Sequence, residues 1–451
     1  MADRSILSTG ILDTDAQALF REGLQWYGRI GMVQNWTGLN SVILKYGVEL
    51  KYEESLSDKD AAMLRKILGS AHPVRKLSLS EISLSAFKAA FHNPDKCPSL
   101  REVHVGFIDC HRKTLDLTEC GVLQSVCSLH LGSDNTGPAF ADDVASYIRQ
   151  NESLRELSIS HSCGGDRGVA TLVEALRTND TLKRFSLGDM ELSSDTLVIF
   201  ATMLTSNFAL ELVNLTNTFP VEEDKVLFVA EDEFYAGVFQ RLQIQWPERL
   251  LPDLTDLLSK EEGCPLLSVV VTNSASIPVV WKFFLALSEV KTLRELYLNA
   301  GDDISSAFTV GIVRVFMLTT TLRVVAISTC VRAEKGHYLT RMLQALRTNR
   351  SVTKFKIEAS ALTPQIATSL SELLAVNSTL NQVTILAYRT MSPAESETIV
   401  NALKSNYILT RLDVDCGCDD SDGRREMRTL LKRNIYPREQ GCGVCYFGCG
   451  R

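Results

Sequence analysis

The sequence predicts an α/β solenoid in which a short strand and a helix alternate many times. Three observations support this fold class. A nine-residue segment recurs along the chain, its apolar frame returns about every 28 residues, and each unit changes from a two-residue to a helical apolar period. Clear copies begin at Asn151, Asn179, Asn349 and Asn377. Because one such unit cannot bury its own apolar face, stacked units must share a continuous core.

Residues 1–36 precede the repeats and are predicted to form an N-terminal helical cap. The stretch from Asp15 to Tyr27 is amphipathic, with Leu19 and Leu24 among its apolar members. The ends of a solenoid need such a cover, and a partner-binding helix is the alternative. The first thirty residues contain no long apolar run, so neither a signal peptide nor a membrane helix is expected there.

Each repeat opens with an apolar anchor followed by apolar residues three and five positions later, as in Leu293, Leu296 and Leu298. The last two are spaced by two and therefore face one side of a short strand. Residues 37–434 are accordingly predicted to form an array of about 14 units. The anchors are Leu39, Val74, Leu100, Val126, Leu154, Leu182, Leu210, Phe239, Leu266, Leu293, Leu322, Val352, Leu380 and Leu409.

The second half of each unit is predicted to be a helix. Between Val169 and Asn179 the apolar residues recur at three- and four-residue spacing, and the segments ending at Asn349, Asn377 and Asn406 follow the same rule. Asparagine tolerates the left-handed conformation that ends many helices. We therefore expect it to act as the helix stop wherever it stands three residues after the last apolar position. These positions are Asn151, Asn179, Asn207, Asn349, Asn377, Asn406 and Asn434.

In these features the chain resembles the leucine-rich-repeat family, specifically its ribonuclease-inhibitor-like subclass. The resemblance implies a horseshoe with parallel strands on the concave face, helices on the convex face and a protein-binding role. It departs from the family eight positions after the anchor, where Asn or Cys is usual and only Cys330 matches. Similar arrays form the sensing half of nucleotide-binding, leucine-rich-repeat receptors, but this chain has no phosphate-binding G-x-x-x-x-G-K-[ST] motif.

In such a horseshoe the residues two and four positions after each anchor face the concave side. Arg and Tyr dominate interface hot spots, so these columns supply the predicted partner contacts. They also make His104 and His130 lateral neighbours, with Glu102 diagonal to them. A metal or pH-sensing site and a plain patch of half-exposed polar residues are the two interpretations of that pair. The predicted partner contacts are Glu156, Arg184, Arg241, Glu295, Tyr297, Lys354 and Lys356.

Residues 435–451 form a tail rich in Cys and Gly. Cys442 and Cys445, together with Cys416 and Cys418 at the end of the last strand, supply four thiolates at spacings that can hold structural zinc. S-acylation, which would attach the chain peripherally to a membrane, and a redox-labile flexible tail are the alternatives. A prenylation box is excluded because Cys449 is third from the end. No other cofactor is predicted.

Composition and motifs limit the classes of function. With 54 acidic and 47 basic residues the net charge is −7, which disfavours a nucleic-acid binder. Neither H-E-x-x-H nor G-x-S-x-G occurs. We therefore expect a non-enzymatic protein-binding scaffold or sensor, without a transmembrane segment, in innate immunity or ubiquitin recruitment. The scattered cysteines favour the cytoplasm.

Two alternatives remain open at this stage. One is a GTPase-activating or other hydrolase-regulating protein, because the Ran GTPase-activating family shows that leucine-rich arrays can assist hydrolysis. The other is an extracellular recognition protein, because the chain has six N-x-[ST] sequons. Four of these six lie at the helix-stop position of the repeat, so the fold itself explains them.

Overall fold

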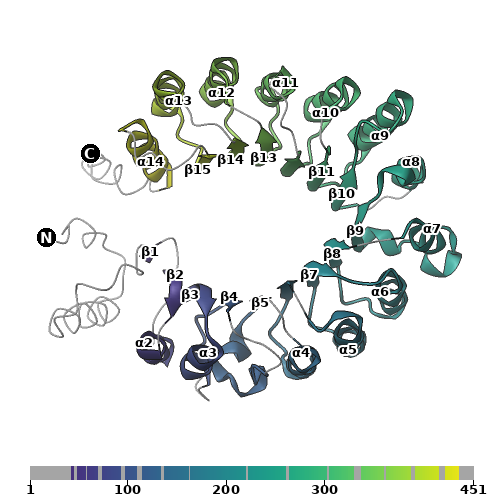
Figure 1. Ribbon diagram of the computed structural model, residues 1–451, viewed down its shortest axis with the longest axis vertical. Helices are drawn as coiled ribbons and strands as arrows, with labels where there is room; N and C mark the ends of the chain where they lie inside the picture. Colours follow the sequence, from purple (N-terminus) through teal and green to yellow (C-terminus); the bar gives the residue numbers. More distant parts are fainter. Residues whose placement is uncertain are drawn as a thin grey trace, which may run out of the picture. The chain divides into compact units, whose positions relative to one another are not determined.

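The computed structural model describes residues 42–435, apart from 45–47, 57, 70–73, 93–96, 109–113, 134–136, 162, 220–221, 261–263, 302–303, 330–336, 360–361, 388–391 and 416–421. The chain divides into two compact units, Met1–Ile244 and Gln245–Arg451. Within each unit the strands line one side and the helices the other (Figure 1). No helix in the described part of the chain is long and apolar enough to cross a bilayer. The predicted cap, residues 1–36, and the tail from residue 436 lie outside the described residues.

The first unit alternates strands with helices and short 3-10 turns. Its strands are β1 (Val42–Leu44), β2 (Val48–Leu56), β3 (Val74–Ile82), β4 (Glu102–Phe107), β5 (Ser128–Ser133), β6 (Glu156–His161), β7 (Arg184–Glu191), β8 (Leu212–Phe219) and the start of β9 (Leu242–Trp246). Its helices are α2 (Asp58–Gly69), α3 (Leu84–Phe91), α4 (Pro138–Gln150), α5 (Gly165–Thr178), α6 (Asp195–Ser206) and α7 (Glu223–Glu231). The 3-10 turns are η2 (Leu117–Glu119), η3 (Gly121–Ser125), η4 (Glu233–Tyr235) and η5 (Val238–Gln240).

The second unit repeats this alternation more regularly. After the end of β9 come the strands β10 (Leu266–Val270), β11 (Glu295–Asn299), β12 (Val324–Ser328), β13 (Lys354–Ala359), β14 (Gln382–Ala387) and β15 (Arg411–Asp415). The 3-10 turn is η6 (Glu248–Leu250), and the helices are α8 (Leu251–Lys260), α9 (Ile277–Glu289), α10 (Ser306–Leu318), α11 (His337–Leu346), α12 (Pro364–Val376), α13 (Pro393–Ser405) and α14 (Asp422–Ile435).

From β2 onward neighbouring strands pair in parallel and in sequence order, which confirms the predicted fold class. In β4 the side chains of Val103, Val105 and Phe107 are buried and alternate with half-buried residues. The strand β11 repeats the pattern with Leu296 and Leu298. The buried face packs against the apolar stripes of the helices, so each unit has one continuous core between strands and helices.

The start of the array differs from the prediction. The frame anchored at Leu39 correctly places a strand at Val42–Leu44, but this strand, β1, pairs with β2 in the antiparallel direction. The first strand of the parallel series is β2, which pairs with β3. The strand β2 was not predicted, because each anchor predicts one strand and no anchor was assigned between Leu39 and Val74, which are 35 positions apart.

The asparagines at the helix ends hold consecutive repeats together by side-chain hydrogen bonds. The Nδ2 group of Asn377 donates to the carbonyls of Leu346 (2.7 Å) and Asn349 (3.0 Å), which belong to the preceding repeat. Its Oδ1 atom accepts from the backbone N–H groups of Thr379 (2.9 Å) and Leu380 (2.8 Å). Equivalent bonds from Nδ2 are made by Asn151, Asn179, Asn207, Asn349, Asn406 and Asn434.

This arrangement corrects the predicted role of these asparagines. Where they cap a helix, their φ angles lie between −93° and −83°, so they do not adopt the left-handed conformation. They are selected because an amide both donates and accepts, and a buried turn needs both functions. We name the seven residues the asparagine ladder. The ladder lies three positions before the anchor. It is therefore distinct from the Asn or Cys position of the leucine-rich-repeat family, which lies eight positions after the anchor.

The ladder also accounts for the sequons that coincide with it. The side chains of Asn151, Asn349 and Asn377 are 2%, 4% and 5% exposed. Their Nδ2 atoms, the atoms to which an N-glycan would be attached, point into the protein and donate to backbone carbonyls. A glycan at these three positions is therefore incompatible with the fold.

Candidate functional site

The sheet face opposite the helices of the first unit carries a row of polar residues two positions after the anchors. In β3 to β6 these are Lys76, Glu102, Ser128 and Glu156, which are register neighbours. Lys76 Nζ lies 2.8 Å from Glu102 Oε1, and Ser128 Oγ donates to Glu156 Oε2 at 3.5 Å. One ion pair and one hydrogen bond thus join neighbouring strands in this row, in which Glu156 is half-buried.

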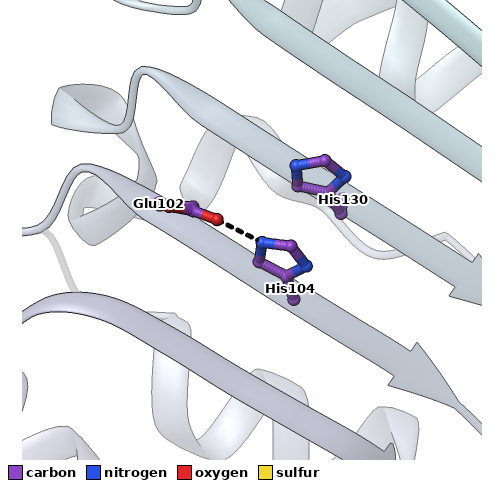
Figure 2. Close-up of side chains that lie close together, drawn as sticks. All are labelled: Glu102, His104 and His130. Atoms are coloured by element: carbon purple, nitrogen blue, oxygen red, sulfur yellow. Dashed lines mark hydrogen bonds and ion pairs between the residues drawn. The ribbon is translucent and has the colours of Figure 1, made fainter. Parts of the chain in front are cut away.

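His104 and His130 are register partners on β4 and β5, as the sequence predicts (Figure 2). Their rings stack with centroids 4.0 Å apart and an interplanar angle of 13°. Nε2 of His104 lies 2.6 Å from Glu102 Oε1, and Nε2 of His130 lies 3.0 Å from Ser128 Oγ. Both rings thus turn the same nitrogen toward the residue two positions earlier on their own strand. One donor atom from each of Glu102, His104 and His130 falls within 4.8 Å of the other two.

The protonation of this cluster follows from its surroundings. Partial burial, reinforced by repulsion from His104, lowers the pKa of His130 to about 4. Partial burial raises the pKa of Glu102, but hydrogen bonds from Lys76 and His104 outweigh it and keep that pKa below the usual value. At neutral pH the cluster therefore contains a neutral imidazole at His130 beside an ionised carboxylate at Glu102.

Of the predicted contacts in the first unit, Arg184 lies where the columns place it. It is exposed on β7 and is the register neighbour of Glu156 on β6. Arg241 bonds to the protein backbone. Its NH1 group donates to the carbonyls of Asn207 (2.7 Å) and Leu210 (3.2 Å), and its NH2 group to that of Leu204 (2.6 Å).

The physical reason is a gap in the asparagine ladder. The ladder position of the repeat that contains β9 holds Ala236, whose side chain has no donor to offer the end of α6. The guanidinium of Arg241 supplies the missing N–H groups to the end of α6 and the turn after it. Burial lowers the pKa of Arg241, although a guanidinium remains charged at neutral pH. These bonds give Arg241 a structural role that the columns did not predict, and its contact with a partner stays a prediction.

Arg241→Met should lower the free energy of unfolding by about 2–3 kcal/mol, because three carbonyls lose donors from a charged group while the stem is kept. Urea denaturation followed by circular dichroism measures the change. Arg184→Met is the matched control, since Arg184 is exposed on a strand, and its effect should stay within about 0.5 kcal/mol. Equal losses in the two variants would contradict the capping role.

In the second unit the predicted contacts lie on the sheet face opposite the helices, on β11 and β13. Tyr297 and Glu295 are half-buried on β11, and the hydroxyl of Tyr297 donates to Glu295 Oε2 at 2.8 Å. Lys354 and Lys356 are exposed on β13. In register, Ala326 of β12 stands between Tyr297 and Lys356. On this face Ala326 thus offers only a methyl group between a phenol and a lysine.

A hollow of about 650 Å³ continues this surface toward α14. Lys356, Arg411, Arg424 and Arg428 line it, together with Asp413. Arg411 Nε lies 2.5 Å from Asp413 Oδ2, so the charges of these two lining residues offset each other. The two arginines of α14 were missed by the sequence columns because they belong to a helix. Their i, i+4 spacing on a charged helix was the signal that could have found them.

The four predicted zinc ligands, Cys416, Cys418, Cys442 and Cys445, lie outside the described residues, so the zinc and acylation hypotheses stay predictions. The described cysteines within the repeats are free thiols, and Cys97, Cys120 and Cys163 are buried. Burial raises the pKa values of Cys120 and Cys163, which makes these thiols poor nucleophiles.

Comparisons with known proteins find a similar sequence over part of the chain and several similar structures. No protein-family model matches it. Over 163 residues, 33% of the chain, it is 25% identical to "NACHT, LRR and PYD domains-containing protein 5" of Mus musculus, and the match covers 12% of that relative's length. It is similar to the tropomodulin C-terminal domain of Caenorhabditis elegans, with a TM-score of 0.28 and 19% identity over 35% of this chain and 93% of that one. It is also similar to a chain of the Rad7 and Elc1 complex in yeast, with a TM-score of 0.45 and 16% identity over 74% and 82% of the two chains.

Proposed function

We propose that this leucine-rich-repeat protein is a non-catalytic scaffold that binds an acidic segment of a protein partner on the sheet face of its second unit. The observation that carries the proposal is the positive surface formed by the exposed Lys354 and Lys356 beside the hollow at α14. This surface belongs to a chain whose net charge is −7. A local excess of the opposite sign is a feature that selects partners by charge.

Tyr297 and Glu295 give the surface shape and direction. The phenol ring offers apolar area at a low entropic cost, and a partner side chain could pack against it beside the small Ala326. Glu295 holds the hydroxyl of Tyr297 and adds a negative end to the row. An extended partner segment would therefore lie across the strands, with its acidic residues over β13 to β15. The leucine-rich-repeat region in the mouse relative's name is consistent with this class of function.

The charge-reversed variant Lys354→Glu/Lys356→Glu should reduce binding of an acidic segment at least about tenfold, because two attractive charges become repulsive. The full chain is used to pan a phage-displayed peptide library, and the enriched peptides are measured by fluorescence anisotropy. We expect acidic peptides whose affinity falls as salt rises.

Lys282→Glu/Lys291→Glu is the matched control, because both lysines are exposed and lie away from the strands of the same unit, one in α9 and one just after it. This control should bind the peptides as the wild type does. Equal weakening by both double variants would show a bulk charge effect and overturn the assignment. Tight binding of a single-stranded oligonucleotide at the same surface, with no acidic peptide enriched, would assign it to nucleic acid instead.

A further inference from the structure

We propose that Glu102, His104 and His130 form a binding site for a divalent transition-metal ion, Zn²⁺ by the chemistry of its donors. The site lies on the sheet face of the first unit and is independent of the partner surface proposed for the second unit. It combines two imidazole nitrogens and one carboxylate oxygen, a donor set that zinc accepts with three protein ligands and one open position. Hard cations such as Mg²⁺ and Ca²⁺ prefer oxygen donors and are disfavoured by the two imidazoles.

The fold brings the donors together without any cost in backbone rearrangement. His104 and His130 occupy the same register position on adjacent parallel strands, and Glu102 lies two residues before His104 on the same face. The residues between them, Val103 on β4 and Leu129 on β5, are fully buried and fix both strands in the core. The positions of the three donor side chains are therefore set by the most rigid part of the unit.

The remaining movement is confined to the side chains. A tetrahedral ion at zinc distances holds its donors about 3.4 Å apart. In the structure the three donor atoms already lie within 4.8 Å of one another. The two rings must also turn out of their stack, because imidazoles inclined by only 13° direct their nitrogen lone pairs almost parallel. This is a rotation of side chains, since the strands can stay at their usual spacing of about 4.8 Å. Both Nε2 atoms already turn toward the same end of the strands, so no ring has to flip.

Neighbouring side chains complete the environment. Lys76 contacts Glu102 Oε1, the oxygen that also meets His104. When Oε1 binds the ion, the second carboxylate oxygen remains free to accept from Lys76, which keeps Glu102 oriented in the way that outer partners orient metal ligands. Ser128 Oγ stands 3.0 Å from Nε2 of His130 and can hold a water molecule in the fourth position. That open position is where a carboxylate or imidazole from another molecule could also bind.

A third histidine of this unit, His92, gives the matched control. His92 Nδ1 lies 3.8 Å from Glu119 Oε2, so it pairs an imidazole with a carboxylate as the cluster does. Among the described residues, His92 and Glu119 are not joined by a third donor close enough to complete a metal site. Substitution of His92 should leave metal binding unchanged, which separates the specific site from any histidine near an acid.

The test is titration of the full chain with Zn²⁺ by calorimetry, with Co²⁺ as a spectroscopic probe. We expect His104→Gln and His130→Gln each to remove one bound Zn²⁺ per chain, and Glu102→Gln to weaken that ion at least about tenfold, since loss of an outer partner alone costs about 10–100-fold. His92→Gln should bind as the wild type does. Far-ultraviolet circular dichroism verifies that each variant remains folded. If a histidine variant does not fold, the weaker zinc binding expected of Glu102→Gln is the result that tests the site.

Co²⁺ distinguishes this site from the cysteines elsewhere in the chain. The Co²⁺ component that disappears in His130→Gln should show ligand-field bands without thiolate-to-metal charge transfer, because its donors are nitrogen and oxygen. Unchanged zinc stoichiometry in both histidine variants would overturn the proposal. So would a lost component that carries thiolate charge transfer, which would assign the ion to cysteines.

Discussion

Asn377→Ala should lower the free energy of unfolding by about 2–4 kcal/mol, a large effect for the loss of one side-chain amide. The side chain is 5% exposed and makes four hydrogen bonds to backbone groups of 2.7–3.0 Å. Alanine leaves two carbonyls and two N–H groups without these partners in a buried turn. Each unsatisfied buried group costs about 1–3 kcal/mol, and relaxation keeps the total below the sum.

Urea denaturation measures the global loss, and hydrogen exchange localises it. The amides of Thr379 and Leu380, which donate to Asn377, should exchange faster in the variant than in the wild type. Asn401→Ala is the matched control, because Asn401 is exposed on α13 and its Oδ1 accepts only from Lys404 among the bonds that the structure describes. Its effect should remain within about 0.5 kcal/mol. Similar shifts for the two variants would mean that the ladder bonds contribute nothing net.

Gly168→Ala should be still more damaging, at about 3 kcal/mol or more, although helix propensity alone favours Ala over Gly by about 1 kcal/mol. Gly168 is buried inside α5. A Cβ atom at this position would lie 1.7 Å from the carbonyl oxygen of Cys163 and 3.1 Å from Cβ of Ala141 on α4. The first of these atoms belongs to the backbone, so α5 would have to shift away from the turn that precedes it.

Gly165→Ala is the comparison within the same helix. Its φ is +66°, but nothing lies within 4 Å of the added carbon, so only backbone strain of about 1–2 kcal/mol is expected. Thermal unfolding and the yield of soluble protein are measured for both variants. If Gly168→Ala does not fold while Gly165→Ala does, the order of the two effects is already established. A milder loss at Gly168 than at Gly165 would contradict the steric explanation.

The sequence predicts those features that depend on local spacing. The apolar frame at Leu293, Leu296 and Leu298 predicts a strand with a buried face, and Leu296 and Leu298 are buried on β11. The same arithmetic places His104 beside His130, because register between neighbouring parallel repeats follows directly from the anchors. Periodicity and pairing are therefore readable from one chain when the unit repeats.

Features that depend on a distant hydrogen-bond partner could not be predicted. The Asn residues were identified, but their bonds to carbonyls about one repeat earlier were not, because spacing gives no information about which groups a turn leaves unsatisfied. Arg241 was assigned to a partner surface from its column, yet it replaces a ladder residue that the sequence lacks at Ala236. The hollow needed the placement of α14 against β13 to β15, which no strand frame contains.

The asparagine ladder also gives the array a direction of assembly. Asn179, Asn207, Asn349, Asn377 and Asn406 each donate to a carbonyl that stands 31 to 33 residues earlier in the chain. On the ribosome the acceptor is therefore always synthesised before its donor. A newly made repeat can then bond to a helix end that has already been synthesised. Nascent chains lengthen by about 5–20 residues per second, so each repeat has seconds to dock before the next one emerges. The ladder is thus suited to growth from the amino-terminal side onward, one repeat at a time.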